Sequence, residues 1–339
     1  MKRNISLIMI IIAAAALVFA CNNKKDEAST SKTVSPASVE EKTIHIGVSQ
    51  FVQHPALDAV YKGIVDGMTS LGYDNIEYDY QNSNADPNTA MQIASLFNSK
   101  KKDMVVGIAT TNSQALKSGT HDIPVIYAAI TDPVSAGLVE SLDKGDPGIT
   151  GTSYNNPFKE QIEFLTSFHD VKVLGQVYTG GEANALFQAK QVEKACAELG
   201  IKYIGTSIAS SAEVKSATES IINRVDAIYV TNDNTVVSAL GGLVDTAIAH
   251  KIPVLSADTS SAKDNPVFIA WGFDWYYIGQ QTAVLMDKVL KGEKPEDMPT
   301  TVISDPSHMN MMLNKVVADE IGIEFPEEVL KQAKTVITE

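Results

Sequence analysis

Cysteine is nearly absent from this chain of 339 residues. Beyond Cys21 the sequence holds only one more cysteine, Cys196. The globular part therefore cannot form an intrachain disulfide, and a core built from roughly 300 residues does not need one. Cys196 stands in the amphipathic stretch VEKACAELG, where we expect a small core residue.

Positive charge is also scarce. The chain has 27 lysine and arginine residues against 41 aspartate and glutamate residues. Without Lys2 and Arg3, 25 basic residues face 41 acidic ones, which gives a net charge of −16. A nucleic-acid-binding protein needs a basic face, so we expect no nucleic acid partner.

The only other arginine is Arg224, in the stretch IINRVDA. It lies at the amino end of an expected strand, away from the carboxyl ends where ligands of α/β sheets bind. We therefore expect no guanidinium clamp, so a ligand carboxylate would be met by backbone N–H groups and hydroxyls.

Catalytic motifs are missing as well. The sequence has no G-x-S-x-G, no H-E-x-x-H and no glycine-rich phosphate loop. Its six histidines, at 45, 54, 121, 169, 250 and 308, lack the spacing of metal ligands. We predict a protein that is not an enzyme, with no catalytic residues, no metal and no cofactor.

The longest apolar run lies at the N-terminus. Lys2 and Arg3 precede an apolar segment from Leu7 to Ala20. This segment is short for a membrane span and is typical of a secretory signal. We predict that residues 1–20 are a signal peptide.

The stretch VFAC (18–21) resembles a lipobox, the site at which bacterial lipoproteins are cleaved and lipidated. It predicts lipidation of Cys21 and a protein anchored to a bacterial membrane, in the periplasm or on the cell surface; ordinary signal cleavage is the alternative. Residues 21–42 are polar and rich in serine and threonine, so we expect a flexible tether.

The remainder of the chain repeats itself once, at an offset near 128 residues. The matching stretches are 44–47 with 172–175, 71–72 with 199–200, 103–116 with 226–240, and 121–125 with 250–254. Because four matches occur in the same order, we predict two similar lobes.

Each half alternates short apolar runs with amphipathic stretches. Near-continuous apolar runs at 104–109 and 124–130 suit strands of a parallel sheet covered on both faces. In the second half we expect helices over 182–199, 212–223 and 235–249. The predicted fold is α/β, with two doubly wound parallel-sheet lobes.

Polar side chains follow several of these strands, at the sheet edge where such folds bind ligands. Asn, Asp and Thr at such junctions are also ordinary helix N-caps, and the two roles are compatible. The candidate ligand-binding residues are Gln50, His54, Thr110, Thr111, Asn112, Asp132, Tyr178, Asn184, Asp233, Asn234, Asp258, Phe273 and Trp275.

These residue types favour a small zwitterion. Asp233 and Asp258 suit an ammonium group, whereas helix starts near Thr110 and Asn184 suit a carboxylate. Phe273 and Trp275 would wall the ligand's side chain or pack in the core or hinge. A sugar suits such a cleft almost as well.

Seven stretches together resemble the ABC-transporter substrate-binding proteins of the tryptophan-binding-like kind, across residues 43–331. They are GVSQFVQHPALDAVYKGIVDGM, ATTNSQAL, AITDPVSAGLV, GEANALFQAKQVEKACAELGI, VTNDNTVVSAL, IPVLSADTSS and GFDWYYIGQQTAVLMDKVLKGEKPEDMP. The resemblance implies a type I periplasmic-binding-protein fold, with two lobes around a three-strand hinge. The better-known relatives of the tryptophan-binding-like kind bind aromatic amino acids. By analogy Thr110, Asn112, Asp132, Asn184, Asp233, Asn234 and Asp258 line its cleft, while Ala185 replaces the family's usual serine.

The resemblance also implies the lobe boundaries. The first lobe would comprise 43–153 and 275–305, and the second 155–271 and 308–339. We expect a monomeric, lipid-anchored receptor that captures an amino acid and delivers it to an ABC permease. The resemblance favours an aromatic amino acid. The alternatives are a sensor for a sugar or nucleoside on the same fold, and an exported hydrolase.

Overall fold

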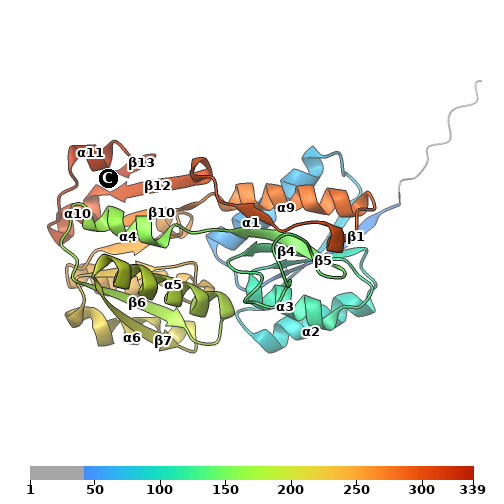
Figure 1. Cartoon of the computed structure of the whole chain (residues 1–339), viewed down its shortest axis with the longest axis horizontal. Coiled ribbons are helices and arrows are strands. Elements are labelled where there is room, and N and C mark those ends of the chain that lie inside the picture. Colours follow the sequence, from blue (N-terminus) through green and yellow to red (C-terminus); the bar gives the residue numbers. More distant parts are fainter. Residues whose placement is uncertain (1–41) are drawn as a thin grey trace, which may run out of the picture. The chain divides into compact units, whose positions relative to one another are not determined.

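The computed structural model describes residues 42–339 (Figure 1). The predicted signal peptide, Cys21 and nearly all of the tether lie outside the described residues. Within residues 42–339, no helix has both the length and the apolar character that a membrane span requires.

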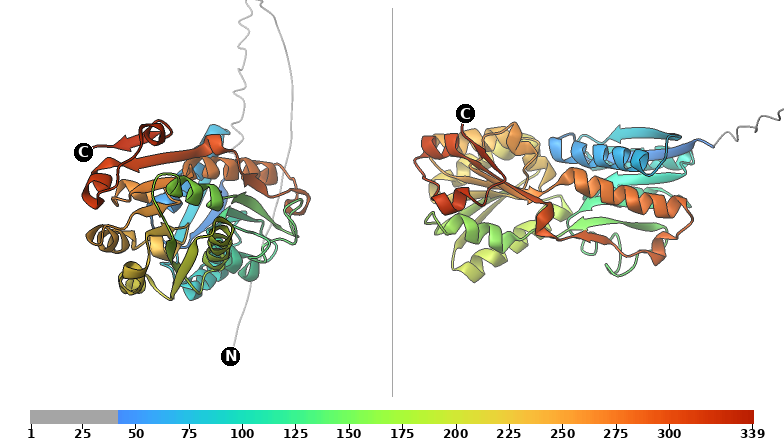
Figure 2. Two further views of the ribbon diagram at one scale, coloured as in Figure 1. Left: turned by 60° about the vertical axis from the view of Figure 1, so that its left-hand side comes forward. Right: turned by 90° about the horizontal axis from the view of Figure 1, so that it is seen from above.

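The first lobe is built on a six-stranded sheet whose neighbouring strands are all parallel. In spatial order its strands are β11 (Thr301–Ile303), β5 (Ile149–Tyr154), β4 (Val125–Ile130), β3 (Met104–Ile108), β1 (Ile44–Gln50) and β2 (Ile76–Asn82). Its helices are α1 (Pro55–Ser70), α2 (Pro87–Ser99), α3 (Thr110–Gly119) and α9 (Trp275–Leu290). Helices α1 and α9 lie side by side over one face (Figure 2).

The second lobe is built on a seven-stranded sheet. In spatial order its strands are β13 (Thr335–Ile337), β12 (Met309–Asn314), β10 (Ile269–Phe273), β9 (Val254–Ser256), β8 (Ala227–Val230), β6 (Val173–Thr179) and β7 (Lys202–Ile208). Only the pairing of β10 with β12 is antiparallel among these described strands. The prediction of two doubly wound α/β lobes is confirmed.

The helices of the second lobe are α4 (Phe158–Thr166), α5 (Ala183–Leu199), α6 (Val214–Ile221), α7 (Asn234–Val237), α8 (Leu240–Ala249), α10 (Lys315–Ile321) and α11 (Glu327–Leu330). Short 3-10 turns are η1 (Ser211–Glu213), η2 (Ile222–Arg224), η3 (Ser261–Lys263), η4 (Pro295–Asp297) and η5 (Pro306–His308).

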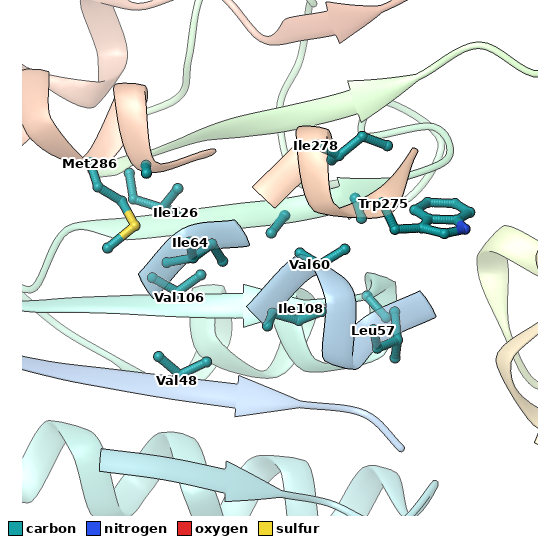
Figure 3. Packing of buried hydrophobic residues seen from close by; sticks show 14 of the residues in the cluster. Val48, Leu57, Val60, Ile64, Val106, Ile108, Ile126, Trp275, Ile278 and Met286 are labelled. Carbon is teal, nitrogen blue, oxygen red and sulfur yellow. The ribbon is translucent and has the colours of Figure 1, made fainter. Parts of the chain in front are cut away.

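Helix α1 shows how local sequence specifies an element. Pro55 occupies its first turn, where a missing N–H costs nothing. Apolar residues at three- and four-residue spacing, from Leu57 to Met68, form its buried face. Gly72, with φ of 95°, takes the left-handed conformation that lets the chain turn away. Figure 3 shows this face packed with α9 against the strands of the first sheet.

The structure departs from the sequence-based expectation in the stretch 235–249. We expected one helix there, but α7 ends at Val237 and α8 begins at Leu240. The hydroxyl of Ser238 donates to the Thr235 carbonyl, and Ala239 leaves the helical region with φ of −123° and ψ of 24°. This local bonding competes with a continuous helix.

The chain crosses between the two sheets three times within residues 42–339. It leaves the first sheet after β5 and enters the second at β6. It returns after β10 through α9, which packs on α1, and crosses again between β11 and β12. This connectivity places the carboxyl ends of strands from both sheets around one cavity.

Candidate functional site

A pocket lies between the lobes; its empty space, part of which is open to solvent, amounts to about 360 Å³. The first lobe contributes His54, Ala56, Leu57, Ala109, Thr110, Ala129, Thr131, Tyr154 and Trp275 to its lining. The second lobe contributes Asn184, Asn232, Asp233, Asn234, Val237 and Asp258. Most of these residues follow the carboxyl end of a strand, where doubly wound sheets bind their ligands.

The first-lobe wall contains the N-terminus of α3. Ala109 precedes this helix with φ of 74° and ψ of 163°, a region normally reserved for glycine. Ala129, at a register shift in β4, also has a positive φ of 59°. Such conformations persist only where the surrounding fold imposes them, and they gather at ligand sites. The first N–H groups of α3, from Thr110 onward, have no intrahelical acceptor.

Two aromatic side chains form another part of the first-lobe wall. The rings of Tyr154 and Trp275 meet edge to face, with centroids 5.0 Å apart and an interplanar angle of 87°. The Tyr154 hydroxyl lies 2.8 Å from the hydroxyl of Thr131. Trp275 begins α9, at the end of the first-lobe core (Figure 3). Its Nε1 donates across the cleft to Asp258 Oδ1 at 3.0 Å.

The second-lobe wall is supported by a buried carboxylate, Glu182, which precedes α5. Its oxygens accept from Asn234 Nδ2 at 3.0 Å, from Asn184 Nδ2 at 3.3 Å and from the hydroxyl of Thr235. Only 4% of Glu182 is exposed. This carboxylate fixes the orientation of the two amides that line the cavity.

Asp233 is fully buried beside this group. It caps α7 by accepting from the Val236 N–H, and it accepts from both the N–H and the hydroxyl of Thr179. Burial, followed by the negative charge of Glu182, raises the pKa of Asp233 to about 7. The Asp233 carboxyl group therefore holds a proton more readily in the folded protein than in an unfolded chain.

His54 stands at the start of α1 and reaches toward the second lobe. Its Nε2 lies 3.4 Å from Asn234 Oδ1. Burial lowers the pKa of His54, against the opposing influence of the Asp258 carboxylate. The imidazole is therefore neutral at pH 7.

Two buried acceptor atoms in the lining have no hydrogen-bond partner within residues 42–339. They are His54 Nδ1 and Asn184 Oδ1. Buried polar atoms are normally paired. The cavity is thus suited to a ligand that carries N–H or O–H donors.

The cavity lining includes His54, Thr110, Asn184, Asp233, Asn234, Asp258 and Trp275 from among the predicted ligand-binding residues. It does not include Gln50, Thr111, Asn112, Asp132, Tyr178 or Phe273. The structure therefore brings about half of the predicted residues together.

Several of the other predicted residues bond within the protein. Asn112 donates to Ser49 at 2.6 Å and accepts from Ser83 at 2.9 Å. Gln50 donates to Asp58 at 2.8 Å. These bonds hold the start of α3 and of α1 against the end of the first sheet.

Asp132 and Phe273 also lie outside the lining. The Asp132 carboxylate accepts from the N–H groups of Val134 and Ser135, as a turn-capping residue does. Phe273 is 1% exposed and packs in the first-lobe core, 6.1 Å from Tyr154 between ring centroids.

Sequence reasoning did not select several residues that matter here. Glu182 follows β6 in the turn GGEAN, so the rule that selected Asn184 applies to it equally. Leu57 and Val237 line the cavity, but their sequence pattern is that of core positions. Tyr154 is the last residue of the buried strand β5, and its sequence ITGTSY does not mark it as a cavity residue.

Two α/β lobes that enclose such a cavity are the architecture of a two-lobed ligand-binding protein. The chain belongs to the family of ABC transporter substrate-binding proteins, whose family model matches residues 45–337. Members of this family bind substrates and are not enzymes. The resemblance found in the sequence and the prediction of a non-enzyme are confirmed.

Three relatives are informative. A tyrosine-binding protein of Clostridioides difficile (strain R20291) is 30% identical over 98% of this chain and 99% of that protein. A Streptococcus pneumoniae ABC domain in complex with L-Trp is 36% identical, with a TM-score of 0.82 over 87% of this chain and 100% of that one. The ligand-free, open structure of a C. difficile substrate-binding protein with adhesive properties is 31% identical, with a TM-score of 0.65 over 88% of this chain and 100% of that one.

Proposed function

We propose that this protein is the solute receptor of an ABC importer for an aromatic amino acid, tyrosine or tryptophan. The observation that carries the proposal is the cavity between the lobes, which has an acceptor-rich wall opposite a helix N-terminus. The relatives that bind tyrosine and L-Trp support this choice of ligand.

The ammonium group of the ligand faces the second lobe. Asn184 Oδ1 is an unpaired acceptor, and Asp233 and Asp258 supply negative charge. The Asp258 oxygens already accept from Trp275 and from the N–H groups of Ser260 and Ser261. The carboxylates therefore act chiefly through their field, while the neutral amide makes the direct hydrogen bond.

The carboxylate of the ligand faces the N-terminus of α3. This helix has ten residues, and its first N–H groups at Thr110 and Thr111 can donate to an anion. The strained backbone at Ala109 fixes the direction of these groups. No arginine is required, in agreement with the scarcity of arginine in the sequence.

The ligand's side chain lies against Tyr154, Trp275, Leu57 and Val237. These residues bring two rings and two aliphatic groups to one cavity. Aromatic rings favour the edge-to-face and offset contacts that such walls offer.

The lobes are in a closed arrangement. His54 and Trp275 of the first lobe bond to Asn234 and Asp258 of the second. The TM-score is higher against the L-Trp complex than against the ligand-free, open structure, 0.82 against 0.65. We infer that the ligand closes the cleft and that a permease receives the closed form.

Export and anchoring are part of the same proposal. We infer that residues 1–20 direct export and that lipidated Cys21 retains the protein outside the cytoplasmic membrane. The apolar leader, the VFAC stretch and the family support this. Labelling with a radioactive fatty acid tests it: the full chain should be labelled, Cys21→Ser should not, and a labelled Cys21→Ser variant would contradict the inference.

Calorimetric titration with the twenty amino acids, and with a panel of sugars and nucleosides, tests the proposed ligand class. We expect heat of binding for tyrosine or tryptophan. Binding of a sugar or nucleoside without any amino acid would favour the sensor alternative instead.

A further inference from the structure

The orientation of the His54 ring is set from the second lobe. Glu182 accepts from Asn234 Nδ2 at 3.0 Å, which turns the amide nitrogen of Asn234 toward the carboxylate. The amide oxygen then faces His54 Nε2 at 3.4 Å. Because an amide oxygen only accepts hydrogen bonds, the proton of the neutral imidazole lies on Nε2.

The other ring nitrogen, Nδ1, is consequently an acceptor. It is buried without a partner among residues 42–339, and the whole side chain is 7% exposed. An acceptor withdrawn from water without a donor destabilises the state that contains it. His54 lines the ligand cavity, so a donor on the ligand can relieve this cost.

We propose that His54 Nδ1 accepts a hydrogen bond from the polar group of the ligand's side chain, the phenol O–H of tyrosine or the indole N–H of tryptophan. His54 thereby selects these ligands over phenylalanine, which has no such donor. The inference rests on the proposed function, because it concerns the same cavity.

The ligand's ammonium group is the other donor to consider, and the second unpaired acceptor of the lining, Asn184 Oδ1, is the atom proposed to receive it. Asn184, Asp233 and Asp258 belong to the second-lobe wall. His54 comes from the first lobe, where its neighbours in the lining, Ala56 and Leu57, are apolar. Asn234 and the Asp258 carboxylate also lie near the His54 ring. With Asn184 Oδ1 assigned to the ammonium group, His54 Nδ1 is the unpaired acceptor left for a donor on the ligand's ring.

The expected discrimination follows from the unpaired acceptor. A site built to bond an O–H or N–H strongly rejects the analogue that lacks it, because its buried polar atom is then left unpaired. We expect phenylalanine to bind about 10-fold to 100-fold more weakly than the better of tyrosine and tryptophan.

Two substitutions of His54 distinguish recognition of the donor on the ligand's side chain from a role in closing the cleft. In His54→Gln the side-chain amide nitrogen can replace Nε2 and retain the bond to Asn234, but no acceptor remains at Nδ1. In His54→Asn the shorter amide places its oxygen near Nδ1 and loses the bond to Asn234. Asn234 is a positioning residue in this scheme, since it acts on the ligand through His54.

The experiment is calorimetric titration of L-tyrosine, L-tryptophan and L-phenylalanine into the wild-type protein and both variants, with unfolding curves to check the fold. We expect the ratio of phenylalanine to tyrosine or tryptophan dissociation constants to fall at least about 5-fold in His54→Gln. In His54→Asn the ratio should persist while all affinities weaken.

Equal weakening of all three ligands in His54→Gln would overturn the proposal, as would a wild-type protein that binds phenylalanine as tightly as the other two. In both cases the proposed function stands. If the wild-type protein binds none of the three, the proposed function is itself wrong and the role of His54 falls with it. The wild-type ratio remains a test even if one variant fails to fold.

Discussion

Three buried carboxylates, Glu182, Asp233 and Asp258, accept hydrogen bonds only from neutral groups among residues 42–339. Burying charge without a cationic partner is costly. The structure carries this cost beside the cavity, where a ligand ammonium group can offset it. The same arrangement makes stability depend on pH.

Asp233 provides the test. Its pKa is about 7 in the folded protein, raised by burial and then by Glu182, and about 3.9 in an unfolded chain. The folded state therefore binds more protons between these values. The stabilisation that the proton on Asp233 gives to the folded state is complete below about pH 4 and is lost as the pH rises through 7. Over this range the free energy of unfolding falls by no more than about 1.4 kcal/mol per pH unit.

Urea unfolding from pH 5 to pH 7.5 measures this effect. The free energy of unfolding should fall more steeply with pH in the wild-type protein than in Asp233→Asn, which keeps a residue suited to the N-cap. The amide group introduced by Asp233→Asn accepts one hydrogen bond fewer from Thr179 than the carboxylate does. This loss lowers the variant's free energy of unfolding by the same amount at every pH, so the slope of that free energy against pH is the quantity to compare. Parallel slopes would show that Asp233 does not titrate in this range.

At the residue scale, sequence reasoning found polar side chains that follow strands and could not rank them. Asn112 and Asn234 obey the same rule, yet Asn112 bonds to Ser49 and Ser83 while Asn234 lines the cavity. Leu57 looks like any core residue of an amphipathic helix. Which side chains point into a cavity is decided by tertiary packing.

At the scale of elements, the contact between α1 and α9 holds the first lobe together and sets the position of Trp275. The two helices approach at small residues. A Cβ atom added to Gly63 would lie 2.1 Å from the carbonyl oxygen of Tyr276, and one on Gly279 would lie 2.1 Å from that of Val60. Both obstacles are backbone atoms, so neither can move without separating the helices.

We expect Gly63→Ala to destabilise the protein by about 1–3 kcal/mol, because added volume forces a backbone shift. The control is Gly242→Ala in α8, where the nearest atom to the new Cβ is Lys215 Cβ at 3.6 Å. Removing a glycine from a helix without a clash should stabilise by about 0.5–1 kcal/mol. Denaturant unfolding measures both; a neutral Gly63→Ala would contradict the close packing.

Sequence patterns predicted most elements well, because hydrophobic periodicity depends on local burial. The repeat also predicted two lobes, confirmed by the two sheets. The break between α7 and α8 was missed, since it depends on hydrogen bonds at Ser238 rather than on periodicity.

At the scale of the whole molecule, sequence patterns did not indicate which residues meet across the cleft. His54 and Asn234 are 180 residues apart, and Trp275 reaches Asp258 from the other lobe. These pairs form only when the lobes close. They make closure dependent on a few defined bonds.

Small-angle X-ray scattering tests closure in solution. We expect the radius of gyration to decrease when L-tyrosine or L-tryptophan is added, because the ligand favours the closed form. Trp275→Phe keeps a ring in the wall but loses the N–H that Asp258 accepts. It should show a smaller decrease at equal ligand saturation. An unchanged radius in the wild-type protein at saturation would contradict ligand-driven closure.

A crystal structure of the protein grown with L-tyrosine or L-tryptophan tests the central claim most directly. We predict density for the amino acid between the lobes, with its ammonium group at Asn184 and its carboxylate at the start of α3. A ligand bound elsewhere, or in the opposite orientation, would contradict the account.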